Sequence, residues 1–286
     1  MPGLRPSDTI PILDGPFRPN RALDQATRLA ACAAPDNLVW QDDHLLFTSG
    51  RAVLLLEIMN DHDREVEQIL RFESDVTAMA AAKDGSLAIG LAGGGIAIVG
   101  GEHDGEVLDG IAGALSHAAT ALCFADPHTV FACLEPGGSV WRLDLRGMAP
   151  IRLAEGLASP RGLLLRGKDS VVVSEAARCR LVECSASVQR PPRILVDGLP
   201  GYPGRLAPTG TNGIWLTISA LREQEGRYGL VLRLNAAFEA EASLHGSADG
   251  RCRGVTSCLQ TRHELIVACC ADDALISVDL QHQSES

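Results

Sequence analysis

The chain has 286 residues, of which 46% are hydrophobic, and 25 lysine and arginine residues face 36 aspartate and glutamate residues, a formal net charge of −11. The apolar content excludes a disordered chain, and the acidic balance argues against nucleic acid or an anionic membrane as a main partner, because both favour clustered cations. No apolar run reaches the roughly 18 residues of a membrane helix, and the start, MPGLRPSDTIPILDG, lacks the pattern of a signal peptide. We therefore expect a cytoplasmic protein.

Short β-rich segments separated by Gly, Pro, Asp and Asn follow one another along the chain. A pattern of strand, turn and strand occurs six times, in segments 36–50, 76–91, 119–135, 160–176, 204–219 and 254–270. Aligning the copies makes six positions equivalent: Asn37, Thr77, Thr120, Arg161, Arg205 and Thr256. Their intervals of 40, 43, 41, 44 and 51 residues are typical of a propeller with about four strands per blade. A twisted β-sandwich is the alternative, and the regularity of the copies favours the propeller.

Each copy continues into a third strand, and the last copy is followed only by the polar QHQSES. We predict that an N-terminal strand, somewhere in residues 10–31, completes the sixth blade and closes the ring, which removes an exposed strand edge. The expected fold is an all-β, six-bladed β-propeller over residues 32–286. Residues 1–31 form an N-terminal segment that is partly the closing strand.

Most of the nine cysteines lie in apolar strand segments such as ALCFAD and LIVACC, and no CxxC pair is present. Buried thiols without disulfides are expected. The neighbours Cys269 and Cys270 are expected to pack in a strand, because adjacent cysteines seldom form a relaxed disulfide. Trp40 and Trp215 fall in strands and are expected in the core.

In a propeller, the first strand of each blade lines the central channel, and the face at which these strands begin, here called the inlet face, also carries the ends of the second strands. Loops on such a rigid ring are common places for chemistry. The residues expected there are Asp36, Asn37, His117, Ala119, Thr120, Glu135, Arg161, Glu175, Arg205, Ser219 and Asp272.

Two motifs in residues 171–205, SEAARCR and GLPGYPGR, resemble the strictosidine synthase-like family. Residues 35–50 are similar to the opening blade of paraoxonases and gluconolactonase/senescence-marker proteins, and residues 255–280 are similar to the last blade of the strictosidine synthase-like family. This resemblance implies a six-bladed propeller that acts on a small molecule.

Several positions depart from the family pattern. The resemblance implies an axial calcium site in the metal-dependent relatives, and Asp36 and Asn37 match its first pair. Ala119, Arg161 and Arg205 stand where the pattern has asparagine, and cations there would repel calcium. Thr256 replaces the glutamate of strictosidine synthases, and Val76 lies near the place of the paraoxonase histidine. We expect neither a metal nor a cofactor.

Arg161 and Arg205 are the strongest candidate site residues, with Asp36 and Asn37 beside them. In one interpretation, the two arginines form a salt-bridge network with Asp36 and Glu175 in place of a lost metal. In the other, they bind a carboxylate or phosphate of a substrate. Both interpretations can hold together.

Glu175 and His117 are the candidate catalytic groups. Glu175 would serve as a general base if the channel desolvates it, and pairing with Arg161 or Arg205 is the alternative. His117 would serve as an acid or base, and an ordinary loop histidine is the alternative. The triplet Asp61-His62-Asp63 has metal-binding residue types but is expected in a solvated turn, and Glu135 is expected at the rim.

The function expected from these observations is that of a small-molecule enzyme, a metal-independent lactone or ester hydrolase acting on an anionic substrate. The alternative is a propeller that binds a metabolite or a protein partner without catalysis, and a scaffold with a plugged channel is a third hypothesis.

Overall fold

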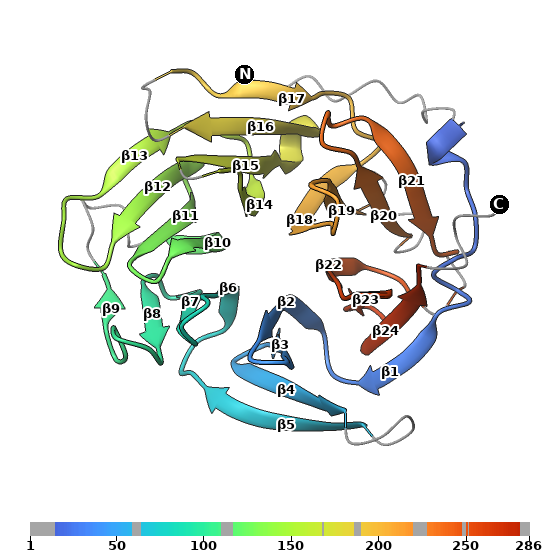
Figure 1. The fold of residues 1–286 in the computed structure, drawn as a ribbon, viewed down its shortest axis with the longest axis horizontal. Helices are drawn as coiled ribbons and strands as arrows, with labels where there is room; N and C mark the ends of the chain where they lie inside the picture. Colours follow the sequence, from blue (N-terminus) through green and yellow to red (C-terminus); the bar gives the residue numbers. More distant parts are fainter. Residues whose placement is uncertain are drawn as a thin grey trace.

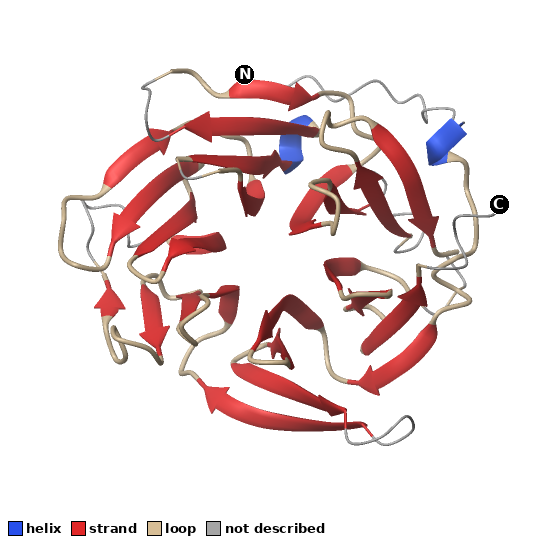
Figure 2. Ribbon diagram, in the orientation of Figure 1, coloured by secondary structure: helices blue, strands red, loops and turns tan. Residues whose placement is uncertain are grey.

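The computed structural model describes residues 15–58, 64–109, 117–167, 169–185, 190–219, 228–247, 250 and 252–280. Six four-stranded antiparallel sheets are arranged as blades around a central axis (Figure 1). Strands make up nearly all the regular structure (Figure 2), and the described helices are the single 3-10 turns η1 (Gly15–Phe17) and η3 (Ala176–Arg178). No helix in the described ranges has the length and apolar character needed to cross a membrane. The predicted six-bladed propeller is confirmed.

Each blade is a meander whose first strand lies nearest the axis. Blades 1 to 3 comprise β2 (Pro35–Gln41), β3 (His44–Ser49), β4 (Ala52–Ile58) and β5 (Arg64–Arg71); β6 (Val76–Ala81), β7 (Leu87–Leu91), β8 (Ile96–Val99) and β9 (Val107–Leu108); and β10 (Ala118–Asp126), β11 (Thr129–Glu135), β12 (Ser139–Asp144) and β13 (Ile151–Ala154). Blades 4 to 6 comprise β14 (Pro160–Leu165), β15 (Ser170–Glu175), β16 (Arg180–Ser185) and β17 (Arg193–Val196); β18 (Tyr202–Pro208), β19 (Ile214–Ser219), β20 (Gly229–Leu234) and β21 (Ala240–His245); and β22 (Val255–Gln260), β23 (Glu264–Cys269), β24 (Ala274–Asp279) and β1 (Thr27–Ala31).

The strand β1 closes the ring as predicted. It pairs antiparallel with β24, from Thr27 opposite Ser277 to Ala31 opposite Ala274. Its central residue Leu29 is buried in the core between blades 6 and 1. The first and the last strand of the described chain therefore lie side by side in one sheet.

The core consists of apolar side chains packed between neighbouring blades. Trp215 is buried there, as predicted, and its indole N–H donates to Oε1 of Gln260 at 2.7 Å. Trp40 is 42% exposed, so its predicted core position is wrong. It lies near the end of β2 and lines the mouth of the central cavity, because side chains of a first strand alternate between the blade interface and the channel.

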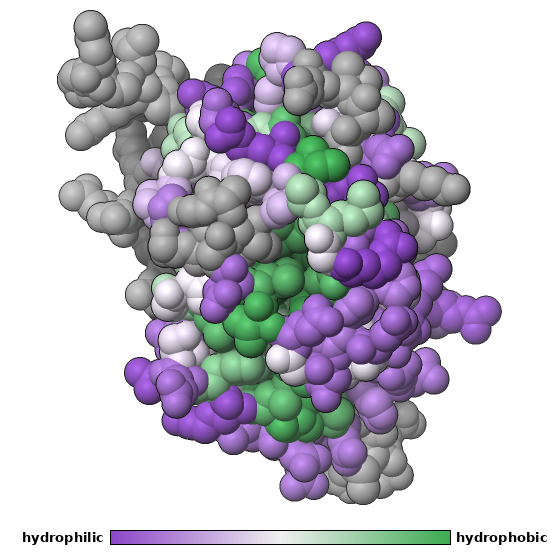
Figure 3. Space-filling view, turned by 90° about the vertical axis from the view of Figure 1, so that its left-hand side faces the viewer, coloured by the Kyte–Doolittle hydropathy of each residue, from purple (hydrophilic) through white to green (hydrophobic). Residues whose placement is uncertain are grey.

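The outer rim of the ring is mixed in polarity. Figure 3 shows apolar side chains forming a band between polar ones on the side that carries blades 2 and 3. Large exposed apolar residues in these two blades are Val107, Met148 and Ile151, on or near the outermost strands β9 and β13.

Cys133, Cys179, Cys184 and Cys258 are buried free thiols, as predicted, whereas Cys32 and Cys123 are half-buried. Cys252 and Cys269 form a disulfide, so the expectation that all the cysteines are unpaired is wrong. The two residues are close because Cys252 lies just before β22, opposite the end of β23, a proximity that arises only when the hairpin folds. Burial raises the pKa of the Cys123 and Cys258 thiols to about 12, so both are protonated and inert.

Candidate functional site

Every first strand carries a β-bulge near its start. The pairing with the second strand shifts at Asp36/Val39, Val76/Ala78, Ala119/Ala121, Pro160/Gly162, Pro203/Leu206 and Val255/Ser257. The residues within these shifts include all six positions that the repeat alignment makes equivalent, and this set is called the bulge layer: Asn37, Thr77, Thr120, Arg161, Arg205 and Thr256. A bulge leaves a residue out of the ladder, so its carbonyl group can turn toward the channel.

The side chain of Arg205 extends across the channel at the level of the bulge layer. Its Nη1 donates to the carbonyl oxygens of Thr120 and, at 3.2 Å, of Arg161. Its Nη2 donates to the carbonyl oxygen of Thr77 at 2.8 Å and to Oδ2 of Asp36 at 3.1 Å. One guanidinium group thus joins blades 1, 2, 3 and 4 to blade 5, and the predicted pairing of Arg205 with Asp36 is confirmed.

Arg161 does not share this arrangement. Its carbonyl oxygen accepts from Arg205, while its side chain is exposed and forms no salt bridge within the described ranges. The prediction that Arg161 belongs to the same ion-pair network is therefore wrong. Its guanidinium remains accessible to an anion at the inlet face.

Glu175 forms a separate cluster at the end of β15. Its side chain is completely buried, Oε1 accepts from the backbone N–H of Ala158 at 2.8 Å and from Arg178, and Oε2 accepts from Arg180. The prediction that Glu175 pairs with Arg161 or Arg205 is wrong, because Arg180 lies directly opposite Glu175 across the β15–β16 pair. In the sequence, the short spacing of Glu175 from Arg178 and Arg180 within SEAARCR could have predicted this pairing.

Hydroxyl groups join five pairs of neighbouring blades at the level of the bulge layer. Each donates to a main-chain oxygen of the next first strand, in the pairs Thr77 to Ala119 (2.6 Å), Thr120 to Pro160 (2.6 Å), Ser174 to Gly204 (2.7 Å), Thr217 to Thr256 (3.3 Å) and Thr256 to Pro35 (2.7 Å). Where the bulge residue is arginine, a hydroxyl of the second strand replaces the missing threonine. Thr256, which stands in place of the glutamate of the resembled family, makes one of these five contacts.

The other predicted residues lie toward the inlet face. Asn37 is buried in the left-handed region at φ 51°, which asparagine tolerates, and its amide donates to the Thr48 hydroxyl at 2.9 Å. His117 precedes β10 directly and is half-buried, and Glu135 is half-buried at the end of β11. Asp61-His62-Asp63 lie outside the described residues.

Beyond the bulge layer, away from the inlet face, the six first strands line a cavity of about 380 Å³. Arg205 and Asn37 lie at its inner end, and its walls are mostly apolar side chains of the six first strands, among them Met79, Phe124, Leu165, Leu206, Leu259 and Trp40. Such a space suits the apolar part of a small molecule.

The oxygen atoms of the bulge layer do not fit an axial calcium ion. Calcium takes six to eight oxygen ligands, and the carbonyl and carboxylate oxygens converging here already accept hydrogen bonds from Arg205. A second cation at the same oxygens would meet the charge of this guanidinium at close range.

Comparison with known proteins finds solved structures with a similar fold. No family model matches the chain, and no curated protein matches it at a significant level. Similar solved structures include a gluconolactonase from Xanthomonas campestris (TM-score 0.68, 16% identity, 89% of this chain and 88% of that one) and the calcium-binding protein regucalcin from Agrobacterium tumefaciens (0.65, 12%, 88% and 92%). A chain of a nidogen/laminin complex is also similar (0.65, 17%, 84% and 90%). At these identities the likeness concerns the fold.

Proposed function

We propose that this chain is a small-molecule hydrolase with gluconolactonase-like architecture, which acts on an anionic lactone or ester at the inlet face without an axial metal ion. The observation that carries the proposal is the position of Arg205, whose guanidinium supplies a fixed positive charge at the level of the bulge layer. A charge held by surrounding dipoles is suited to stabilise developing negative charge on a reacting carbonyl oxygen. Placement in the strictosidine synthase-like branch rests on the SEAARCR and GLPGYPGR motifs and belongs to this proposal.

In this proposal Arg161 binds the anionic group of the substrate, because its guanidinium is exposed and has no salt-bridge partner among the described residues. Asp36 and Asn37 lie on the opposite side of the channel, toward the inlet face. His117 is the preferred acid or base, since it is accessible, while Glu175 would first have to leave Arg178 and Arg180.

The proposal is tested by assaying purified protein on lactones and aryl esters with and without a carboxylate substituent, in EDTA and in added calcium. We expect turnover that is insensitive to EDTA, a KM raised at least tenfold for carboxylate substrates in Arg161→Met, and a kcat lowered in His117→Gln. Arg152→Met, a change of an exposed arginine on β13, is the matched control. Turnover that requires calcium would contradict the proposal.

Binding of a metabolite without catalysis is the second candidate. Two observations favour it: the apolar cavity is large enough for a small molecule, and both carboxylate oxygens of Glu175 are engaged. Saturable binding of an amphipathic carboxylate without hydrolysis of any lactone or ester would select this function.

A further inference from the structure

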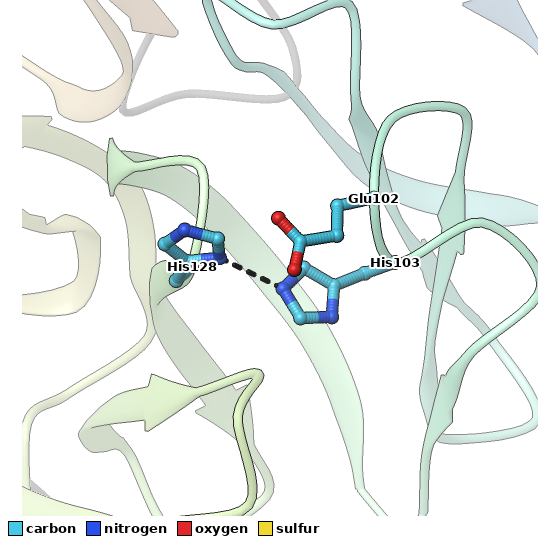
Figure 4. Close-up of side chains that lie close together, drawn as sticks. All are labelled: Glu102, His103 and His128. Atoms are coloured by element: carbon cyan, nitrogen blue, oxygen red, sulfur yellow. Dashed lines mark hydrogen bonds between the residues drawn. The ribbon is translucent and has the colours of Figure 1, made fainter.

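A cluster of metal-binding side chains lies away from the channel, where blade 2 meets blade 3. Glu102 and His103 belong to the loop after β8, and His128 belongs to the turn between β10 and β11. One ligand atom from each residue lies within 4.8 Å of the other two. Figure 4 shows the three side chains converging from these two loops, with the Glu102 carboxylate turned toward the imidazole rings.

The loop that carries Glu102 and His103 has a fixed shape. Gly101 adopts φ +65°, and a Cβ atom there would lie 2.0 Å from the Ser86 hydroxyl, so only glycine fits. Oδ1 of Asp104 accepts from the N–H of Gly100 at 2.7 Å, which closes the loop on itself. His103 is therefore presented from a rigid segment and is only 6% exposed.

The backbone of His128 is fixed equally well. Its N–H donates to Oδ1 of Asp126 at 2.9 Å, and its carbonyl oxygen accepts from the N–H of Leu145 at 2.8 Å. The neighbouring cation Arg146 is paired with Asp144 at 2.7 Å, which offsets its charge near Glu102.

A carboxylate orients the buried histidine. Oε1 of Glu106 lies 2.9 Å from Nδ1 of His103, and Nε2 of His103 lies 2.9 Å from Nδ1 of His128. With Nδ1–H donating to Glu106, the Nε2 lone pair of His103 points toward His128. A carboxylate that holds the second nitrogen of a histidine is the usual outer support of a metal ligand.

We propose that Glu102, His103 and His128 form a binding site for a divalent transition-metal ion of the zinc type, which joins blade 2 to blade 3. Two imidazole nitrogens and one carboxylate oxygen match the ligand types of zinc. Metal–nitrogen bonds of 2.0–2.1 Å in tetrahedral geometry separate the two nitrogens by about 3.3 Å. The observed separation is 2.9 Å, so for an ion to replace the shared proton the nitrogens move apart by about 0.4 Å and both rings turn toward the ion. Water takes the fourth position, since Glu102 is exposed.

The test uses the full chain treated with EDTA and titrated with zinc chloride in a calorimeter. We expect one equivalent to bind, with affinity lowered at least 100-fold in His128→Ala. Glu102→Gln, which removes the carboxylate ligand, and Glu106→Gln are each expected to lower it at least tenfold, the latter because outer carboxylates contribute 10–100-fold to metal affinity. Glu102 is exposed, so its variant keeps the fold. Zinc should also raise the melting temperature of the wild type and not that of His128→Ala.

His44→Ala, a change of an exposed histidine at the start of β3, is the matched control and should leave zinc binding unchanged. Cobalt should give an absorption spectrum without thiolate charge-transfer bands. The proposal is overturned if zinc does not bind, if His62→Ala removes the binding while His128→Ala does not, or if the cobalt spectrum shows thiolate ligands.

Discussion

The two charged clusters near the inlet face, around Arg205 and around Glu175, are neutralised in opposite ways. Arg205 is a single cation shared among main-chain oxygens of three blades and one carboxylate of a fourth. Glu175 is a single anion held by two arginines three and five residues further along its own blade. The first cluster joins blades to one another, whereas the second fixes one turn within a blade. Position on a face therefore does not determine which structural unit a charge stabilises.

The largest loss of stability is expected when Glu175 loses both of its arginine partners. Replacing Arg178 and Arg180 by alanine leaves the fully buried carboxylate of Glu175 without a counter-charge, and the free energy of unfolding should fall by about 3–5 kcal/mol. Urea denaturation measures this loss. Arg193→Ala, which breaks the exposed pair with Glu183, should cost less than about 1 kcal/mol. Equal losses for the two variants would show that the buried carboxylate is hydrated.

A smaller loss is expected at the axis. Arg205→Met removes hydrogen bonds from a charged donor to four oxygens, but water in the channel can hydrate these oxygens, so we expect a loss of about 2–3 kcal/mol. Differential scanning calorimetry measures it, and calcium titrated into the wild type should not bind tightly. Tight one-to-one calcium binding that is lost in Asp36→Ala would contradict the role assigned to Arg205.

Loss of one of the hydroxyl contacts between blades is expected to reduce the free energy of unfolding by a still smaller amount. Thr256→Val removes one hydrogen bond between blades 6 and 1 while keeping the shape of the side chain, and should cost about 1 kcal/mol. Thr27→Val, at an exposed position of β1, should stay within about 0.5 kcal/mol of the wild type. If both variants unfold at the same urea concentration, the hydroxyl contact of Thr256 does not contribute to the joining of blades.

The smallest stability effect is expected for the arginine that neither cluster uses. Arg161→Met should change the free energy of unfolding by less than about 0.5 kcal/mol, because its side chain is exposed. The same variant should lose most of its affinity for a carboxylate ligand in calorimetry. A large stability loss would place Arg161 in the network around Arg205 after all.

The sequence predicts the blades and the bulge layer well, because both depend on a repeat that is visible along the chain. The six aligned positions, from Asn37 to Thr256, coincide with bulges in all six first strands. Side-chain partners are predicted poorly: a long guanidinium group at Arg205 can reach four blades, whereas Glu175 is taken by the arginine opposite it across two strands. Direction and reach depend on the folded backbone.

The cluster between blades 2 and 3 could not be predicted. Glu102 and His103 lie far from His128 in the sequence, and the three residues match no familiar ligand spacing. The disulfide between Cys252 and Cys269 was not predicted for a similar reason, since its residues belong to a loop and to a strand that meet only in the folded hairpin.

The pairing of β1 with β24 has a consequence for the order in which the protein folds. Thr27 is synthesised early, and its partner Ser277 follows only after all the intervening blades have left the ribosome. Contacts between residues so distant in sequence form late and slowly. During synthesis the first strand must therefore remain without its sheet while five blades assemble, and in that interval its row of unpaired backbone groups is open to capture by a chaperone or by another nascent chain.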